Sequence, residues 1–238
     1  MENLDRILAS FKDKKILVVG DLALDTYAEG EIEGISPEAP VHVVSVHNQH
    51  YEPGVAGNVA SNIASLGGKA CIFSFIWEDA EGEILKKLLD ERGIEYFLGT
   101  DSMTTNKTRV TARGQQLMRL DRGKSNRKNF SSEINAQLLR KAEESHLIVI
   151  SDDANGTITP NLMELLIPYR KKMIIDPKPI NKSLYREAYL IVPNQGEALT
   201  MSGCSDIPEA AEKLREELGS NLLITRGGRL TYLLPIIL

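Results

Sequence analysis

Short apolar runs recur along the chain and predict the strands of a buried sheet. The first, Lys15–Gly20, is largely aliphatic and ends in glycine. Runs of this length without polar alternation are typical of strands that are covered on both faces. Comparable runs follow at 147–151, 173–176, 189–192 and 221–225.

Between these runs, apolar residues recur at helical spacing. The leucine and isoleucine side chains of the segment 80–92 share one face, and Gly93 follows as a terminator. Further helices are predicted over 58–66, 131–146, 160–171 and from the capping sequence at Asp206 to Gly219. Strands that alternate with helices predict an α/β fold, in which a mainly parallel sheet carries helices on both faces.

One part of the chain breaks this alternation. Val41–Val46 is rich in β-branched residues, and Thr108–Leu120 has the pattern of one or two further strands that could pair with it. We therefore expect a smaller sheet that projects from the main one.

Composition and charge narrow the range of functions. The 238 residues allow one large domain or two small ones, and 28 basic against 33 acidic side chains give a net charge of −5. This balance argues against wholesale binding to nucleic acid. One stretch rich in basic residues contains few aromatic residues. We therefore interpret it as a solvated loop rather than as a surface that binds nucleic acid. It consists of Arg119, Arg122, Lys124, Arg127 and Lys128.

Localisation and metal chemistry follow from what the sequence lacks. No apolar stretch reaches the ~18 residues of a membrane span, and the N-terminal residues lack the apolar core of a signal peptide. Cys71 and Cys204 lie far apart without C-x-x-C spacing, as in proteins with reduced thiols. We expect a cytoplasmic protein with no membrane partner.

His47 and His50 would point to different faces of a strand, so no zinc is expected there.

The residues that follow the apolar runs are unusually polar. Taken singly, such residues are most often helix caps or solvated loop positions. Five strand ends of the same character predict an anion or sugar site with an associated cation, because ligands of parallel sheets bind beyond the carboxyl ends of the strands. The residues are Asp21, Asp25, Asp152, Asp153, Asp176, Lys178, Asn194, Glu197 and Arg226.

Two glycine-containing segments could bring backbone amides close to a ligand. Pro53–Asn58 precedes a predicted helix, and Thr225–Gly228 follows a predicted strand. Neither has the G-x-G-x-x-G or Walker spacing. A plain tight turn explains the first equally well, and a hairpin turn that leads into Leu230–Leu234 explains the second equally well.

In their order along the chain, several stretches resemble those of the ribokinase-like (PfkB) carbohydrate kinases. They resemble most the branch that phosphorylates D-β-D-heptose 7-phosphate, because ISPEAPV and QQLMRLD are typical of that branch. The matching stretches are VVGDLALDTY (18–27), ISPEAPVHVVSV (35–46), PGVAGNVASNIASLG (53–67), NKTRVTARGQQLMRLD (106–121), SDDANG (151–156), IDPK (175–178), VPNQGE (192–197) and LITRGG (223–228).

The resemblance implies a single ribokinase-like domain over residues 1–238, with a small β lid formed by segments at about 35–50 and 106–121. It implies ATP-dependent phosphorylation, with Mg²⁺, of D-glycero-β-D-manno-heptose 7-phosphate to the 1,7-bisphosphate. It also implies a possible homodimer contact through the lid.

The resemblance also assigns expected roles to individual residues. Substrate would be bound by Asp25, Gly54, Gly57, Asn58, Lys107, Arg109 and Asp152. ATP and its metal would be held by Asp176, Lys178, Asn194, Glu197, Thr225, Gly227 and Gly228, with Glu197 as the metal-organising carboxylate.

Two departures from the family pattern touch this site. The glycine motif that is usually G-G-A-A-N is here Gly54-Val55-Ala56-Gly57-Asn58, which makes backbone approach at Val55 less assured. The segment usually written S-D-Y-x-K-G is SDDANG, in which an aspartate and an asparagine replace an aromatic residue and a cation. The extra carboxylate should weaken the binding of anions.

The largest departure concerns the catalytic base. The sequence has no G-A-G-D motif, which in the family supplies the anion hole and the general base, and it ends on the apolar segment Leu233–Leu238. The resemblance therefore predicts an incomplete domain without a catalytic aspartate and with little or no kinase activity of its own. A separate chain could supply the missing part. The alternatives are a non-catalytic protein that binds a sugar phosphate or acts as a scaffold, and a kinase for another sugar.

Overall fold

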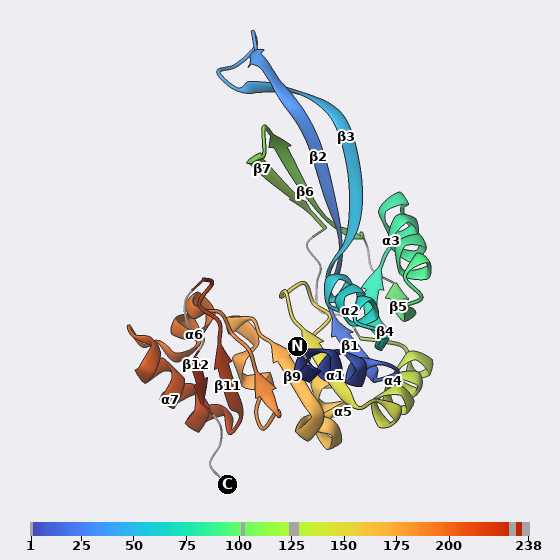
Figure 1. Ribbon diagram of the computed structural model, residues 1–238, viewed down its shortest axis with the longest axis vertical. Helices are drawn as coiled ribbons and strands as arrows, with labels where there is room; N and C mark the ends of the chain where they lie inside the picture. Colours follow the sequence, from blue (N-terminus) through green and yellow to red (C-terminus); the bar gives the residue numbers. More distant parts are fainter. Residues whose placement is uncertain (1, 101–102, 124–128, 229–231, 235–238) are drawn as a thin grey trace.

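A computed structural model describes the chain except for residues 1, 101–102, 124–128, 229–231 and 235–238 (Figure 1). Over the described residues, its main element is an eight-stranded sheet with the order β12-β11-β10-β9-β8-β1-β4-β5. Seven strands run parallel, and β12 pairs antiparallel with β11 at one edge. The strands are β1 (Lys15–Gly20), β4 (Lys69–Ile76), β5 (Glu95–Thr100), β8 (Leu147–Ser151), β9 (Met173–Asp176), β10 (Leu190–Ile191), β11 (Asn221–Ile224) and β12 (Tyr232–Leu234).

The predicted parallel sheet is confirmed, and the bounds predicted for β1, β8 and β9 agree with the structure. The sequence analysis missed β4 and β5. The antiparallel pairing of β11 with β12 favours the hairpin interpretation of the segment between them, although part of that turn lies outside the described residues.

The described residues also form seven α-helices and two short 3₁₀ helices. All helices predicted from spacing are present, but the one predicted over 160–171 is divided into an α-helix and a 3₁₀ helix. The helices are α1 (Glu2–Phe11), α2 (Ala56–Ser65), α3 (Ala80–Glu91), α4 (Ser132–Glu144), α5 (Pro160–Leu165), α6 (Gln195–Ser202), α7 (Ile207–Leu218), η1 (Ile167–Lys172) and η2 (Pro179–Leu184).

The two faces of the main sheet are covered unequally. On one face, a continuous core joins strand residues such as Ile148 and Ile175 to α4, α5, α6 and α7. On the other face, α2 and α3 pack over β1, β4 and β5. Beyond them, aliphatic side chains of β8 to β11 are only half-buried, among them Val149, Ile174 and Leu223.

The second sheet, called here the lid sheet, has the order β3-β2-β6-β7 and projects from the main body (Figure 1). Its strands are β2 (Leu22–Ile35), β3 (His42–Val55), β6 (Thr105–Ala112) and β7 (Gln115–Arg122). The predicted projecting sheet is confirmed, but the predicted pairing is wrong. The segment 41–46 pairs with β2, and β2 lies between it and β6. The lid sheet also begins at Leu22, well before the expected boundary near 35.

Candidate functional site

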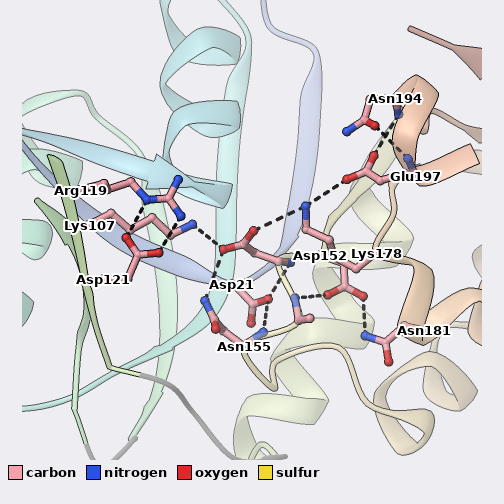
Figure 2. Close-up of polar contacts among 12 residues, drawn as sticks. Asp21, Lys107, Arg119, Asp121, Asp152, Asn155, Lys178, Asn181, Asn194 and Glu197 are labelled. Carbon is pink, nitrogen blue, oxygen red and sulfur yellow. Dashed lines mark hydrogen bonds and ion pairs between the residues drawn. The ribbon is translucent and has the colours of Figure 1, made fainter. Parts of the chain in front are cut away.

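The carboxyl ends of the central strands meet at the base of the lid sheet, where polar side chains converge (Figure 2). Charged groups from three regions are in contact. Lys107 comes from β6 of the lid sheet, Asp153 from the loop after β8, and Lys178 from the segment after β9. The sequence prediction that strand-end residues gather at one place is confirmed for these loops.

Asp21, directly after β1, shapes the loop that follows β8. Its side chain is buried, and its carboxylate accepts hydrogen bonds from the backbone N–H groups of Asp153 (2.8 Å), Asn155 (3.0 Å) and Thr157 (3.0 Å). Three amides on one carboxylate fix the loop strongly. Asp21 was predicted among the strand-end residues of an anion or sugar site, but no role in binding substrate, ATP or metal was assigned to it. The signal that could have singled it out is its place before the strand that leads into the lid.

Asp152 lies beneath the site. Its carboxylate accepts hydrogen bonds from the Tyr185 hydroxyl (2.6 Å), the Asn181 side-chain amide (2.7 Å) and the backbone N–H of Ala154 (2.7 Å). Burial raises the pKa of Asp152, and these hydrogen bonds oppose that rise. The same burial, with the neighbouring Asp152 charge, raises the pKa of Tyr185. Because these bonds engage both carboxylate oxygens of Asp152, its visible role is to anchor the loop.

A chain of ion pairs crosses the site. Lys107 Nζ lies 2.5 Å from Asp153 Oδ2, Lys178 Nζ lies 3.7 Å from Asp153 Oδ1, and Lys178 also donates to Glu197 Oε1 at 3.0 Å. Burial alone would lower the pKa of Lys178, but the hydrogen bond and charge of Glu197 raise it. The lid sheet is therefore tied to the body through Asp153.

Asn194 and Glu197 form a capping box at the start of α6. The Asn194 side chain accepts from the Glu197 backbone N–H, and Glu197 Oε2 accepts from the Asn194 backbone N–H, both at 2.9 Å. The N-x-x-E spacing thus has a structural role. Asp176 is solvent-accessible, yet the surrounding protein removes part of its hydration and the Glu197 charge acts on it. Both effects raise the pKa of Asp176 to about 6.

Whether the site can hold a metal ion depends on the carboxylates of Glu197 and Asp176. Among the described residues, no three or more His, Cys, Asp or Glu side chains form a cluster that could hold a metal ion. Mg²⁺, however, is usually bound by only one or two carboxylates together with substrate phosphates and water. Glu197 and Asp176 fit that smaller requirement.

The lid sheet contributes a second ion pair. Asp25 Oδ1 lies 2.8 Å from Arg109 Nη1, and the guanidinium lies over the ring of Tyr27 at 5.3 Å from its centroid. Both atoms are buried, and within the described part of the chain neither has a well-aligned hydrogen bond. Gly54 lies against this pair, because a Cβ at that position would be 2.8 Å from Asp25 Cγ. The structure thus brings together Asp25, Arg109 and Gly54.

The strand register places the charged residues of the lid on one face. Asp25 pairs with Lys107 across β2 and β6, and Lys107 and Arg109 pair with Asp121 and Arg119 across β6 and β7. Side chains at directly paired positions point to the same side of a sheet. This charged face looks onto the carboxyl ends of the main sheet.

A cavity of about 370 Å³, called here the site cavity, lies between the lid sheet and the body. Its lining residues are Thr105, Lys107, Arg119, Asp121, Arg122, Gly123, Asp153, Asn155 and Lys178. The sequence analysis placed Arg119 and Arg122 in a solvated loop. The predicted loop is wrong for both, because they lie on strand β7 and line the cavity, but the predicted exposure to solvent is confirmed, at 49% for Arg119 and 65% for Arg122. The other members of that basic run, Lys124, Arg127 and Lys128, lie outside the described residues.

The remaining predicted residues take more peripheral places. Thr225 lies beside Asn194, since the two form a parallel bridge and the Thr225 N–H donates to Pro193 O at 2.9 Å. Gly227 and Gly228 are exposed just after it. Gly57 packs closely, because a Cβ there would lie 2.6 Å from Pro53 Cβ. Asn58 is exposed in the first turn of α2.

A larger hollow of about 410 Å³ lies away from these polar groups. It is lined mainly by apolar residues of α1, α2, β1 and β8, among them Phe11, Ile63 and Val149. It offers no convergent charges, so we place the candidate site at the site cavity.

In the described residues, no helix is long and apolar enough to cross a membrane.

Most of the chain matches known protein sequences. A family model described as pfkB family carbohydrate kinase matches residues 13–234. Similar curated proteins include the bifunctional protein HldE of Magnetococcus marinus, which is 35% identical over 90% of this chain and 48% of its own length. The bifunctional protein HldE of a Marinomonas species is 38% identical over 92% of this chain and 48% of its own. The chain thus spans about half the length of these relatives.

Comparison with solved structures shows the ribokinase-like fold. A carbohydrate kinase from Agrobacterium tumefaciens matches 93% of this chain and 73% of its own, with a TM-score of 0.70 and 20% identity. Phosphofructokinase-2 from Escherichia coli in its tetrameric inhibited form matches 94% of this chain and 77% of its own, with a TM-score of 0.71 and 20% identity.

Proposed function

Because the chain belongs to the pfkB family of carbohydrate kinases, we propose that it acts on a phosphorylated sugar, and specifically on D-glycero-β-D-manno-heptose 7-phosphate. With ATP and Mg²⁺, the product would be the 1,7-bisphosphate. The observation that carries the proposal is the Asp25–Arg109 pair, whose facing atoms are buried, beside a site cavity lined by four cationic side chains. Such a pair suits sugar hydroxyls, and the cavity suits a phosphate.

The lid residues are assigned to the sugar. Asp25 Oδ1 can accept from a hydroxyl and Arg109 Nη1 can donate to one, which would satisfy two buried atoms that lack well-aligned partners among the described residues. Gly54 leaves the space for this arrangement. Lys107 and Arg119 line the cavity and are assigned to the substrate's phosphate. Gly57 and Asn58, at the start of α2, are assigned to the opposite side of the sugar.

The strand ends of the body are assigned to the nucleotide. Lys178 and Asn194 would face the ATP phosphates, and the segment from Thr225 to Gly228 would lie along the nucleotide. Glu197, with Asp176 nearby, would hold Mg²⁺ together with the phosphates. The metal ion would supply positive charge that offsets the charge of the transferring phosphoryl group.

The chemical role of these residues is positioning and charge neutralisation. Phosphoryl transfer requires little covalent participation by the protein, so much of the rate comes from alignment and electrostatic stabilisation. The 238-residue sequence contains no G-A-G-D motif, and we assign no residue of it as the proton acceptor.

A non-catalytic sugar-phosphate-binding role is the second candidate. It is favoured by Asp153, a carboxylate that contacts two lysines of the cavity at a position where the family segment carries an aromatic residue. This arrangement retains lid contacts to a sugar but weakens the positive field that ATP phosphates require.

Calorimetric titration of the 238-residue chain tests both candidates. We expect heptose 7-phosphate to bind more tightly than unphosphorylated heptose and fructose 6-phosphate, and Asp25→Asn to weaken its binding about tenfold. Glu187→Gln, a change at an exposed ion pair outside the site, is the matched control.

Each possible result bears on one part of the proposal. Binding of heptose 7-phosphate without binding of Mg·ATP would support the non-catalytic role. Preference for another sugar would reject the heptose assignment, and phosphorylation of that sugar in a substrate panel would reassign the kinase. Failure to bind any sugar phosphate would contradict both candidates.

A further inference from the structure

Asp153 lies between two cations that come from different parts of the fold. One carboxylate oxygen contacts Lys107 of the lid sheet, and the other faces Lys178 of the body. These side chains are largely shielded from solvent, with exposed fractions of 14% for Lys107, 22% for Asp153 and 34% for Lys178. Screening by water and salt is therefore weaker here than for an ion pair on the surface.

The loop geometry fixes the backbone at Asp153 independently of the lysines. The backbone N–H of Asp153 donates to Asp21, and so does that of Asn155. Ala154 between them has a positive φ of 58°, an uncommon conformation for a residue with a side chain. The backbone position of Asp153 is thus set by Asp21, and from that position its carboxylate reaches the two lysines and accepts from the Asn155 side-chain amide at 3.4 Å.

The other cations of the site cavity are also paired. Arg119 forms two hydrogen bonds to Asp121, and Arg122 contacts Glu81. The Arg119–Asp121 pair is local to one strand, and both of its side chains are nearly half exposed, so it can open without other changes. The pairing of Asp153 is different, because one carboxylate contacts Lys107 of the lid and also faces Lys178 of the body, whose other partner is Glu197 at 3.0 Å.

We propose that Asp153 occupies the place of an anionic ligand group and is a specificity-determining residue of the site. The inference rests on the proposed function, since it concerns how that site selects its substrate. A phosphate monoester is mostly a dianion at neutral pH, so it can replace one carboxylate between two ammonium groups. A sugar without a phosphate has no group that can displace Asp153, and the internal ion pairs then remain closed.

The test uses inorganic phosphate as the probe, so that it does not depend on the identity of the sugar. Asp153→Asn retains the size of the side chain and the backbone bonds to Asp21 but removes the charge. We expect it to bind phosphate about tenfold more tightly than the unaltered chain, with a gain that shrinks as salt is added. Adding Lys107→Met to Asp153→Asn should abolish the gain. Glu187→Gln, which makes the same change of net charge outside the cavity, should alter binding less than about twofold.

Asp153→Ser serves as a second variant, and thermal unfolding shows that each variant is folded. The proposal is overturned if both Asp153 variants bind phosphate as weakly as Glu187→Gln does, or more weakly than the unaltered chain. Weaker binding would mean that Asp153 positions the lysines rather than competing with the ligand.

Heptose 7-phosphate, titrated into the same proteins, separates this inference from the proposed function. If phosphate binds more tightly to Asp153→Asn but heptose 7-phosphate binds no better than phosphate, the substrate assignment fails and the role of Asp153 stands. If heptose 7-phosphate binds tightly to the unaltered chain and more weakly to Asp153→Asn, the substrate assignment stands and the role of Asp153 fails.

Discussion

At Val55, immediately before α2, a β-branched residue adopts a backbone conformation that suits glycine. Its φ is 54° and its ψ is −116°. Conformations of this kind cost about 1–3 kcal/mol for residues with a side chain. The family motif has glycine at this position, so the chain keeps the glycine-like turn although the residue has changed. The structure thus retains the turn at Val55 at the expense of strain, and approach of its backbone to a ligand stays a prediction.

Val55→Gly should therefore raise the free energy of unfolding. Relief of strain exceeds the loss of a half-buried side chain and the greater freedom of glycine in the unfolded chain, and we expect a net gain of about 1 kcal/mol. Urea unfolding measures this change. Val43→Gly, at a more exposed position within β3, is the control and should be destabilising. A loss of stability in Val55→Gly as large as that in Val43→Gly would contradict the strain.

The raised pKa of the Asp176 carboxyl group predicts that the stability of the chain depends on pH. Its pKa is raised to about 6, above the ordinary value of 3.8. Between these two values the folded chain binds more protons than the unfolded chain, so the contribution of Asp176 to stability is present at low pH and is lost as the pH rises towards 6. Asp176→Asn should stabilise the chain by roughly 1 kcal/mol at about pH 7.5, after allowance for the solvent exposure of the side chain.

Urea unfolding at about pH 4 and about pH 7.5 measures this effect. The gain from Asp176→Asn should be clear at the higher pH and small at the lower one. Glu187→Gln reports the general effect of removing a negative charge. An equal gain for both variants at both pH values would show that Asp176 is not perturbed.

Residue patterns predicted part of this site and missed another part. Asp153 and Lys178 could be found because strand ends of a parallel sheet converge regardless of the details of packing. Arg119 could not be found in this way. Which side chains of β7 face the cavity depends on its register with β6, in which Arg119 lies opposite Arg109. A shift of one residue would turn Arg119 to the other side.

At the scale of elements, prediction succeeded for strands that are short, purely aliphatic runs. β1 and β8 are such strands, and their aliphatic sequences distinguish them from the flanking helices. Burial alone was not enough, because β4 is buried along nearly its whole length and was missed. β2 was missed because it leaves the body and becomes exposed, so its second half is mixed with polar and glycine residues. Because β2 was not predicted, the segment 41–46 was assigned the wrong partner. In the structure this segment pairs with β2.

The partly uncovered face of the main sheet supports a prediction on two neighbouring residues of β11. Leu222 is buried against the helices, whereas Leu223 points to the opposite face and is only half-buried. Leu222→Lys should cost about 4 kcal/mol or more, because it places a charge in the core. Leu223→Lys should cost less than about 1 kcal/mol and should reduce aggregation. Urea unfolding and light scattering measure the two effects. Equal destabilisation by both substitutions would show that this face is as well packed as the other.

At the scale of the whole molecule, the lid sheet has two different faces. One carries the charged residues of the site, and the register places Met118 and Leu120 of β7 on the other. Their exposed fractions are 50% and 53%. Apolar side chains on a projecting edge strand favour association with another sheet. We therefore expect two copies of the chain to associate through the lid.

The double substitution Met118→Glu with Leu120→Glu should shift this association towards monomer. Like charges placed at a shared apolar surface repel and lose the energy of burial, which should raise the dissociation constant about tenfold or more. Light scattering coupled to size exclusion, over a range of concentrations, measures the change. Ile180→Glu, at a highly exposed position in η2, is the control and should leave association unaltered. If the double variant associates as strongly as the unaltered chain, the contact lies elsewhere. A shift produced equally by Ile180→Glu would point to nonspecific association of apolar surface rather than to the lid.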